Sequence, residues 1–504
     1  MDFLSHEEKA VLELRRLFHD RGYTRVTPGR FQEYDLFAEN RNFHNIGSVI
    51  TFMDADGRLM ALKPDVTLSI IKNTQDTPAA QRLYYVDEVY RLARENREYK
   101  AISQVGVELI GGGHEQVNAE IVALALDSLG TIGKNAVLEI SHMGFVSGLF
   151  DGLELSENSR NILFGLIHAK DTRGVSDVLK SLGIYDERAE RILALTVLHG
   201  NARKSLNKVR GLIQNAEMQT AFDELARIAE TQDTVSLDLS MINDLDYYNG
   251  LIFRGYIEKA PAAVLSGGRY DGLMRRMGKK SGAIGFAITL NNLPRDETAS
   301  EPDGWVCVAL PKGRLGDGAR KLLTGSKNAD DFGRRLIVED CENKLRYFLV
   351  KPSDVAIYVE RGTADIGIVG KDVLLESRPD VYELTALDIG TCKVSVAAPY
   401  EFSENPDVPL RVATKYVNIA KSHYSSINRS IEIIKLSGSI ELAPLLGLSD
   451  VIVDIVETGS TLRENDLSII SDITEISARL IANKAAYKFK AQRIDELAKK
   501  MTDR

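Results

Sequence analysis

The chain of 504 residues has few cysteines, no excess of basic residues and no long apolar segment. Its three cysteines, Cys307, Cys341 and Cys392, are widely spaced and odd in number, which indicates a reducing cytoplasm and no zinc site. The net charge of −9 argues against general nucleic-acid binding. The apolar runs reach only the length of a strand, so no membrane span is expected. The first residues also lack the apolar core of a secretion signal.

Histidine is scarce in the second half, where His423 is the only one after residue 200. Histidine-based acid–base catalysis is therefore not expected in that half. The length exceeds what one core supports and predicts two to four domains. The hydrophobic content of 44% and the charged content of 27% are typical of a soluble globular protein. A polar, turn-rich segment at 296–304 is predicted to be a linker between two halves, 1–295 and 305–504.

The stretch VIVDIVETGSTL, residues 451–462, combines a β-branched run with a turn. The run is typical of a strand buried on both faces. The turn would point backbone N–H groups and hydroxyls at one spot suited to a phosphate. Carboxylates would repel a bare phosphate, so we expect Asp454 and Glu457 to bond the hydroxyls of a ribose attached to it. The alternative is an ordinary strand followed by a capped helix. The turn residues are Thr458, Gly459, Ser460 and Thr461.

The first half contains strand signals on both sides of a helical segment. Ser5, with Glu8 three residues later, predicts a capping box at the start of a helix. The pair Asp56-Gly57 predicts a turn between two short strands. Residues 143–232 read as helices with little glycine, which indicates a helical insertion. Strand patterns return with LDYYNGLIF and GGRYDGL.

These motifs and their order resemble the catalytic core of class II aminoacyl-tRNA synthetases, histidyl-tRNA synthetase in particular. The resemblance covers roughly residues 1 to 295 and implies an antiparallel sheet domain with a helical insertion. It assigns the amino group of histidine to Asp65 and Thr67 and the imidazole to Glu108 and Tyr248. A carboxylate and a phenol can together bond both ring nitrogens. The histidine-binding residues that it implies are Asp65, Thr67, Gln104, Glu108, Tyr247 and Tyr248.

The residues that handle ATP in that family are replaced. Its Arg-x-Glu motif corresponds here to Arg91, Leu92 and Ala93. Its catalytic arginine corresponds to Asn243, and the arginine that stacks on adenine corresponds to Asn292. The anticodon-binding domain is also missing. This pattern is similar to the regulatory subunit of ATP phosphoribosyltransferase, a synthetase paralogue, and implies a domain that binds histidine without activating it and does not bind tRNA.

The second half alternates strands and helices from the strand WVCVALP onward. The alternation predicts a mostly parallel sheet in two α/β lobes, with a ligand cleft at the carboxyl ends of the strands. We expect the closing segment, 476–501, to be a helix packed on the first lobe.

Five motifs of the second half are similar to the short form of ATP phosphoribosyltransferase: LPKGRL, ADIGIVGKDVLLE, ATKYVN, GSIELAPL and DIVETGSTL. The resemblance covers about 305–504 and implies a two-lobed fold like that of periplasmic binding proteins. In that family the short enzyme depends on the synthetase-like subunit, so each half of this chain predicts the other. The implied reaction is attack by N1 of ATP on the anomeric carbon of phosphoribosyl diphosphate, with loss of diphosphate. It is the first step of histidine biosynthesis.

The departing diphosphate needs positive charge around it. Mg²⁺ carried by the diphosphate, together with positive side chains, would supply that charge. The resemblance assigns this role to Arg334 and Lys351, and Lys312 and Arg314 are further candidates. The family usually has arginine at the position of Lys351, and lysine keeps the charge but not the bidentate fork. No metal held by the protein itself is expected.

Two other interpretations remain at this point. One is a histidyl-tRNA synthetase-like enzyme fused to something unrelated, against which Ala93, Asn243 and Asn292 speak. The other treats the second half as a two-lobed solute-binding module, which the same fold permits. Such a module has no need of DIVETGST, and an export signal would be expected. The favoured interpretation is a cytoplasmic homo-oligomer that binds ATP, phosphoribosyl diphosphate and L-histidine as an inhibitor.

Overall fold

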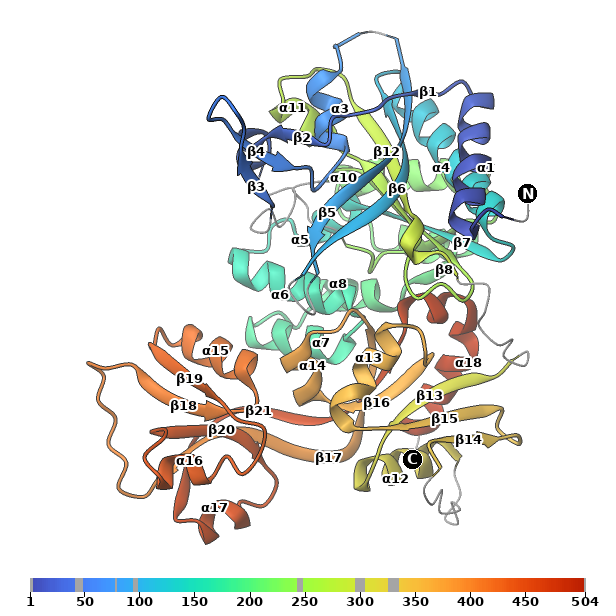
Figure 1. Cartoon of the computed structure of the whole chain (residues 1–504). Helices are drawn as coiled ribbons and strands as arrows, with labels where there is room; N and C mark the ends of the chain where they lie inside the picture. The colour runs from blue at the N-terminus through green and yellow to red at the C-terminus, as the bar shows by residue number, and fades with distance from the viewer. Residues whose placement is uncertain are drawn as a thin grey trace. The chain divides into compact units, whose positions relative to one another are not determined.

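The computed structural model describes residues 3–40, 49–77, 79–93, 98–242, 248–294, 304–324 and 335–502. The chain divides into two compact units, Met1–Ser300 and Glu301–Arg504 (Figure 1). The segment predicted to be a linker lies outside the described residues, apart from Gly304. Across the described ranges, no helix has the length and apolar character needed to cross a membrane.

The core of the first unit is a nine-stranded sheet. All of its pairings are antiparallel except β1 with β5 and β7 with β9, which agrees with the antiparallel sheet that the resemblance implies. In sheet order the strands are β1 (Thr24–Arg25), β5 (Gln81–Leu92), β6 (Tyr99–Ile110), β12 (Ala283–Thr289), β11 (Leu265–Arg269), β10 (Leu251–Ile257), β7 (Ala136–His142), β9 (Ser236–Asp238) and β8 (His199–Asn201).

Helices cover both faces of this sheet. On one face, α1 (His6–Asp20) and α4 (His114–Ile132) contribute Leu14, Phe18 and Ile121 to the main core. Helix α1 begins with the predicted capping box, in which Ser5 Oγ accepts a bond from Glu8 N at 3.1 Å. A second core forms around α2 (Tyr34–Ala38), α3 (Thr67–Asn73) and α11 (Asp271–Arg276). A separate three-stranded sheet consists of β2 (Phe31–Glu33), β4 (Leu59–Leu62) and β3 (Thr51–Met53).

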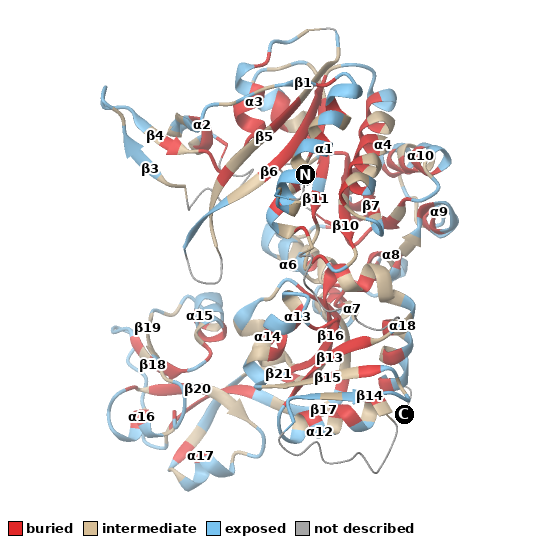
Figure 2. Cartoon of the chain, turned by 45° about the vertical axis from the view of Figure 1, so that its right-hand side comes forward, coloured by how far each residue is buried: buried red, intermediate tan, exposed pale blue. Residues whose placement is uncertain are grey.

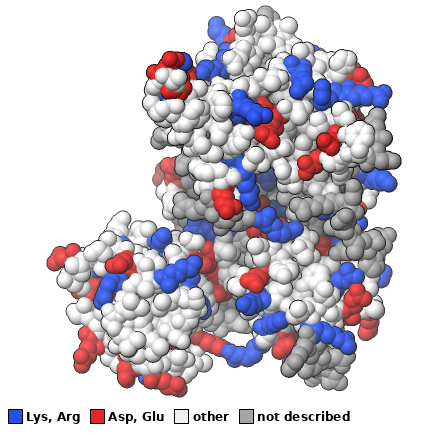
Figure 3. Space-filling model, in the orientation of Figure 1, with Lys and Arg blue, Asp and Glu red and all other residues white. Residues whose placement is uncertain are grey.

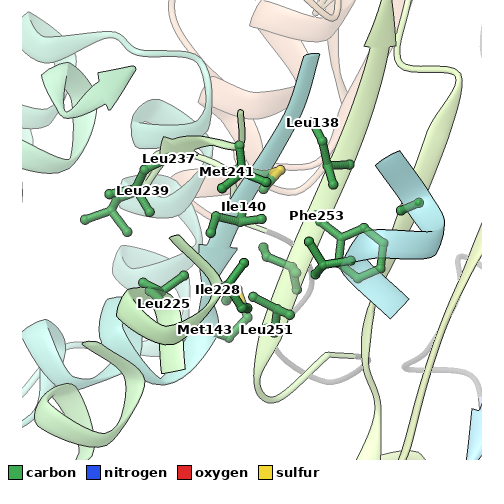
Figure 4. Close-up of a cluster of buried hydrophobic side chains, with 14 of the residues drawn as sticks. Leu138, Ile140, Met143, Leu225, Ile228, Leu237, Leu239, Met241, Leu251 and Phe253 are labelled. Carbon is green, nitrogen blue, oxygen red and sulfur yellow. The ribbon is translucent and has the colours of Figure 1, made fainter. Parts of the chain in front are cut away.

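The region expected to be a helical insertion contains α5 (Met143–Phe150), α6 (Glu157–His168), α7 (Thr172–Ser181), α8 (Glu187–Val197), α9 (Ala202–Arg210) and α10 (Ala216–Thr231), with β8 between α8 and α9. These helices share the core of the sheet. Leu225 and Ile228 of α10 lie in one cluster with Ile140 of β7 and Leu251 of β10 (Figure 4).

The second unit is built on one continuous nine-stranded sheet. In sheet order its strands are β14 (Ile337–Asp340), β15 (Leu345–Val350), β13 (Val306–Pro311), β16 (Ile366–Gly370), β21 (Leu467–Ala482), β17 (Tyr382–Pro399), β20 (Val451–Val456), β18 (Leu410–Thr414) and β19 (Ile431–Lys435). Buried residues lie mainly along the strands inside the two lobes, whereas β14, β19 and the middle of β17 and β21 also contain exposed residues (Figure 2).

Two lobes share this sheet. The first lobe comprises β13 to β16 with α12 (Arg314–Thr324), α13 (Val355–Glu360) and α14 (Lys371–Ser377). The second lobe comprises β18 to β20 with α15 (Val417–Ser426), α16 (Leu442–Leu445) and α17 (Ser460–Glu464). The closing helix α18 (Lys484–Thr502) packs Tyr487 and Ile494 into the core of the first lobe, as expected.

The expectation of a mostly parallel sheet is wrong for the middle of this unit and for its edge strand β14, which pairs antiparallel with β15. Strands β17 and β21 are 18 and 16 residues long, pair antiparallel with each other and run from one lobe into the other. The expected helix over 476–501 is also wrong in its first part, because 476–482 is the end of β21. That segment contains helix-forming residues, yet β16 and β17 offer it hydrogen-bonding partners on both sides. Tertiary pairing therefore overrides local propensity.

Two leucines of α1 allow a test of the core of the first unit. Leu14 is fully buried, whereas Leu12 is 47% exposed. Leu14→Ala should lower the free energy of unfolding by about 2–5 kcal/mol because it leaves a cavity. Leu12→Ala should change it by less than about 0.5 kcal/mol. Urea unfolding followed by circular dichroism measures both, and equal losses would contradict the assigned packing.

Candidate functional sites

The first candidate site lies on one face of the sheet of the first unit, where glycines leave room for larger side chains. Glu108 of β6 pairs with Gly285 of β12, which pairs in turn with Gly268 of β11. A Cβ atom at Gly285 would lie 2.0 Å from Glu108 Oε2, and one at Gly268 would lie 2.6 Å from the Tyr248 ring. The two glycines are therefore required for Glu108 and Tyr248 to lie over the sheet.

Glu108 is only 2% exposed, and both of its oxygens accept hydrogen bonds. Thr67 Oγ1 donates to Oε1 at 2.7 Å, and the hydroxyl of Tyr270 donates to Oε2. Burial raises the pKa of Glu108 to about 8; the bonds from Tyr270 and Thr67 oppose this rise, and the charge of Asp65 adds to it. A buried carboxyl whose pKa lies near neutral pH can exchange a proton with a ligand. In its ionised form it can also accept a hydrogen bond from a ligand N–H group.

Asp65 lies near this carboxyl, two residues before the start of α3. Its Oδ1 accepts a bond from Leu68 N at 3.0 Å. The Arg91 guanidinium is 3.9 Å from Asp65 Oδ2, and Arg91 Nε donates to Pro64 O at 2.8 Å. Arg91, which the resemblance places in the altered nucleotide motif, therefore lies next to a residue with a predicted role in binding histidine.

The structure brings together four of the six predicted histidine-binding residues: Asp65, Thr67, Glu108 and Tyr248. Burial raises the pKa of Tyr248, and the charges of Glu108 and Asp65 raise it further. Gln104 is also buried and lies on the same face of β6, four residues before Glu108. In the sheet it is paired with Asp87 of β5. Tyr247 and Asn243 lie outside the described residues.

Two tyrosines of this site were not predicted. Tyr270, which binds Glu108, belongs to the motif GGRYDGL, so a signal for it was present. Tyr85 lies opposite Gly106, where a Cβ atom would be 2.3 Å from its ring. Burial raises the pKa of Tyr85, and Glu108 and Asp65 raise it further. Nothing in the local sequence distinguishes Tyr85 from an ordinary strand tyrosine.

Asn292, which occupies the position of the family's adenine-stacking arginine, has a different set of contacts in this chain. Asn292 Nδ2 donates to Ala263 O at 2.9 Å. The side chain therefore ties two backbone segments of the first unit together.

The second candidate site is the turn after β20. Gly459 adopts a left-handed conformation with φ of +69°, and α17 begins directly after it. The hydroxyls of Thr458 and Ser460 are 3.0 Å apart, and Ser460 N donates to Thr458 Oγ1 at 3.4 Å. The side chains of Thr458, Ser460 and Thr461 are exposed. The strand and the turn lie where the sequence predicts them, with polar groups accessible to a ligand.

Glu457 connects this turn to the first lobe. Its Oε2 accepts a bond at 3.1 Å from the guanidinium of Arg314, at the start of α12. Both side chains are largely exposed, so the pair contributes little to stability. It does bring one predicted cation within contact distance of one predicted ribose-binding carboxylate.

Two further predicted cations, Lys312 and Lys351, come directly after the neighbouring strands β13 and β15. Strands β13 and β15 are parallel, with Pro311 paired to Val350, and Lys312 N donates to Val350 O at 2.9 Å. Lys312 and Lys351 are therefore adjacent at one edge of the sheet, and both are exposed. Arg334 lies outside the described residues. Three of the four predicted cations thus lie near the carboxyl ends of parallel strands.

Asp454 has a partner that was not predicted. Lys415 Nζ lies 3.4 Å from Asp454 Oδ1. Burial raises the pKa of Asp454, and the charge of Lys415 opposes that rise. Lys415 belongs to the motif ATKYVN, so the sequence carries a signal for this region, although the resemblance assigns no role to the lysine.

Comparisons with known proteins match the two halves separately. A family model described as histidyl-tRNA synthetase matches residues 2–293, and one described as ATP phosphoribosyltransferase matches residues 351–503. An ATP phosphoribosyltransferase of Brachyspira hyodysenteriae is 56% identical over 201 residues, which are 39% of this chain and 98% of the relative. One of Thermoanaerobacter sp. is 50% identical over 202 residues, 39% of this chain and 95% of the relative.

A solved structure from Bacillus halodurans C, described as an ATP phosphoribosyltransferase regulatory subunit/histidyl-tRNA synthetase, is also similar. It covers 69% of this chain and 94% of its own, with a TM-score of 0.53 and 23% identity. At this identity the likeness supports the fold alone.

The raised pKa of Glu108 predicts a pH effect on stability. Because the folded pKa of about 8 lies above the ordinary value of 4.5, the stability that Glu108 contributes is present at low pH and lost as the pH rises through 8. Glu108→Gln does not titrate, so its unfolding temperature should rise relative to that of the unmodified protein between pH of about 5 and 8.5. Differential scanning calorimetry across this range measures the change.

A matched control is Glu120→Gln. Hydrogen bonds from Arg82 lower the pKa of Glu120, so its contribution is present at neutral pH and lost on acidification. This variant should be destabilised at neutral pH, by an amount that shrinks as the pH falls. If Glu108→Gln and the unmodified protein show parallel pH profiles, the assigned environment of Glu108 is wrong.

Proposed function

Because the chain belongs to the histidyl-tRNA synthetase family in its first half and to the ATP phosphoribosyltransferase family in its second, we propose that it is an ATP phosphoribosyltransferase inhibited by histidine. It transfers the phosphoribosyl group of phosphoribosyl diphosphate to ATP and releases diphosphate, the first step of histidine biosynthesis. The observation that carries this proposal is the 56% identity to such an enzyme over 98% of its length.

The turn after β20 binds the phosphoribosyl group. Thr458, Gly459, Ser460 and Thr461 bind the 5′-phosphate through hydroxyls and N–H groups. Asp454 and Glu457 accept hydrogen bonds from the ribose hydroxyls, so Arg314 releases Glu457 when the ribose arrives. Charge-assisted bonds of this kind are stronger than neutral ones, which makes the two carboxylates the main determinants of ribose binding.

In the reaction, N1 of the adenine ring attacks the anomeric carbon. A C–N bond forms, and the bond between that carbon and the diphosphate oxygen breaks, with its electron pair leaving on diphosphate. Lys312, Arg314, Lys351 and Arg334 neutralise the charge that develops on the leaving group. Magnesium would enter bound to the diphosphate, where it would neutralise part of the charge of the leaving group. Asp454 and Glu457 already have cationic partners, Lys415 and Arg314.

The first unit binds L-histidine as an inhibitor. Asp65 and Thr67 bind the amino group, and Gln104 and Tyr247 complete the set. Glu108 and Tyr248 bind the two imidazole nitrogens, since a carboxylate can accept an N–H group and a phenol can donate or accept. A ligand N–H group would also compensate the burial of the Glu108 carboxylate, which is costly without such partners.

The first unit does not charge tRNA. The nucleotide-side residues of the synthetase are replaced, and Asn292 bonds to the backbone instead. On the face drawn in Figure 3, basic and acidic side chains are interspersed.

We further propose a homo-oligomer in the cytoplasm.

The enzymatic proposal predicts that the protein, with ATP, phosphoribosyl diphosphate and Mg²⁺, forms phosphoribosyl-ATP. Histidine should lower the activity or a substrate affinity roughly 5- to 150-fold, the usual range for coupling of about 1–3 kcal/mol between sites. Tyr248→Phe should relieve this inhibition and leave uninhibited turnover nearly unchanged. Tyr185→Phe, at an exposed tyrosine of the same unit, is the control and should keep the inhibition.

Three results would contradict parts of this proposal. Absence of phosphoribosyl-ATP would refute the activity. Loss of turnover in Tyr248→Phe without loss of inhibition would refute the histidine site. Histidine-dependent exchange of diphosphate into ATP at the rate of a synthetase would show that the first unit still activates histidine.

The ribose-binding role of Glu457 is testable separately. Glu457→Gln removes one charge-assisted contact and should raise the KM for phosphoribosyl diphosphate roughly ten- to hundred-fold, with a much smaller change for ATP. Glu464→Gln, an exposed glutamate in α17, is the control and should change neither. Steady-state kinetics with each substrate varied in turn measures both, and equal weakening of ATP would refute the assignment.

A further inference from the structure

Lys415 lies in the turn between β18 and α15, next to the carboxylate of Asp454. Its Nζ is 3.4 Å from Asp454 Oδ1, and the lysine side chain is 42% exposed while that of the aspartate is 18% exposed. The pair is therefore neither a solvated surface contact nor a fully buried one. Its charge interaction is stronger than at an open surface, and the lysine can still adjust its position.

The turn that carries Lys415 is tightly held. Thr414 pairs with Val453, the residue before Asp454, and Thr414 Oγ1 donates to Val453 O at 2.6 Å. The same hydroxyl accepts a bond from Tyr416 N at 2.8 Å. The residues on both sides of Lys415 are thus fixed relative to the strand that carries Asp454.

Tyr416 also restrains the lysine side chain and links it to the first lobe. Lys415 Nζ lies 4.9 Å from the centre of the Tyr416 ring, which is a cation–π distance. The Tyr416 hydroxyl donates to Asp372 Oδ2 of α14 at 2.9 Å. The lysine is therefore held between an anchored aromatic ring and the carboxylate of Asp454.

Among the described residues that act on Asp454, Lys415 supplies the positive charge that opposes protonation of this carboxyl. Burial raises the pKa of Asp454, and Glu441, just before α16, adds to the rise. Against it act Lys415 and the bond from Ile455 N at 2.8 Å. On β17 the residue opposite Asp454 is Ser395, which is uncharged.

We propose that Lys415 is a positioning residue for phosphoribosyl diphosphate, because it keeps Asp454 ionised and aimed at the ribose hydroxyls. The inference rests on the proposed function, in which Asp454 accepts hydrogen bonds from those hydroxyls. A protonated Asp454 loses its negative charge and presents an O–H donor on one of its two oxygens. Lys415 acts through Asp454 and takes no part in the bonds that form or break.

The test combines single and double variants with a pH profile. Lys415→Met should raise the KM for phosphoribosyl diphosphate about tenfold, with little change in the KM for ATP. It should also move the acidic limb of kcat/KM for phosphoribosyl diphosphate upward by about one pH unit, because the opposing positive charge is gone. Lys415→Arg keeps the charge and should restore both. Lys421→Met, at an exposed lysine of α15, is the control and should behave like the unmodified enzyme.

The double variant separates a positioning role from a direct contact with substrate. Asp454→Asn should raise the KM for phosphoribosyl diphosphate, and adding Lys415→Met should then change it less than about twofold, because both substitutions remove the same interaction. Multiplied effects would show that Lys415 contacts the substrate itself and would overturn the proposal. An unshifted pH limb in Lys415→Met would overturn it as well.

Failure of the inference can be told apart from failure of the proposed function. If Asp454→Asn weakens phosphoribosyl diphosphate but Lys415→Met does not, only the role of Lys415 is refuted. If Asp454→Asn has no effect on this substrate, the ribose-binding assignment itself is refuted, and the inference with it.

Discussion

The antiparallel pairing of β17 with β21 is the constraint on which the second unit depends. Each strand is long enough to contribute to both lobes, so the two lobes share one continuous hydrogen-bonded sheet. Register shifts between Leu387 and Cys392 interrupt the ladder between the ends of the pair. Such irregularities bend a strand and increase its twist. The turn after β20 and the start of α12 can therefore meet although 143 residues separate Arg314 from Glu457.

The candidate site of the first unit depends on a different constraint, the burial of the Glu108 carboxyl among tyrosines. Glu108 lies over Gly285 because a larger residue there would collide with it. Thr67 from α3 and Tyr270 from the end of β11 bring the two hydroxyls that satisfy its oxygens. A buried carboxyl held in this way is costly unless its partners are in place.

Each of the two sites contains a buried or partly buried carboxyl group, Glu108 in the first unit and Asp454 in the second. In the first unit, neutral hydroxyls satisfy Glu108 and its pKa stays high. In the second, cations accompany both carboxylates, Lys415 with Asp454 and Arg314 with Glu457. Under the proposed function, the neutral environment would receive a reversible effector, and the cations would assist a substrate that carries phosphate groups as well as hydroxyls.

Several helix starts, strands and turns could be predicted from the sequence, because they depend on interactions between residues that are close together in the chain. The capping box at Ser5 and the strand-turn pattern of 451–462 depend on residues only a few positions apart. The motifs identified the two halves and the residues Asp65, Thr67, Glu108 and Tyr248, which the fold then brings together. The sequence patterns were less informative about β21, since residues 476–482 have a helical composition and become a strand only because β16 and β17 flank them.

Contacts between distant residues are what only the tertiary structure decided. Tyr270 is 162 residues from Glu108, and Lys415 is separated from Asp454 by an entire strand-and-helix segment. Hydrogen bonds and ion pairs depend on distances of about 3–4 Å, which sequence spacing does not determine across such separations. The amino-acid sequence by itself determined which chemical groups each half possesses; the pairing of strands determined which of those groups meet, because only backbone register places side chains from separate segments on one face.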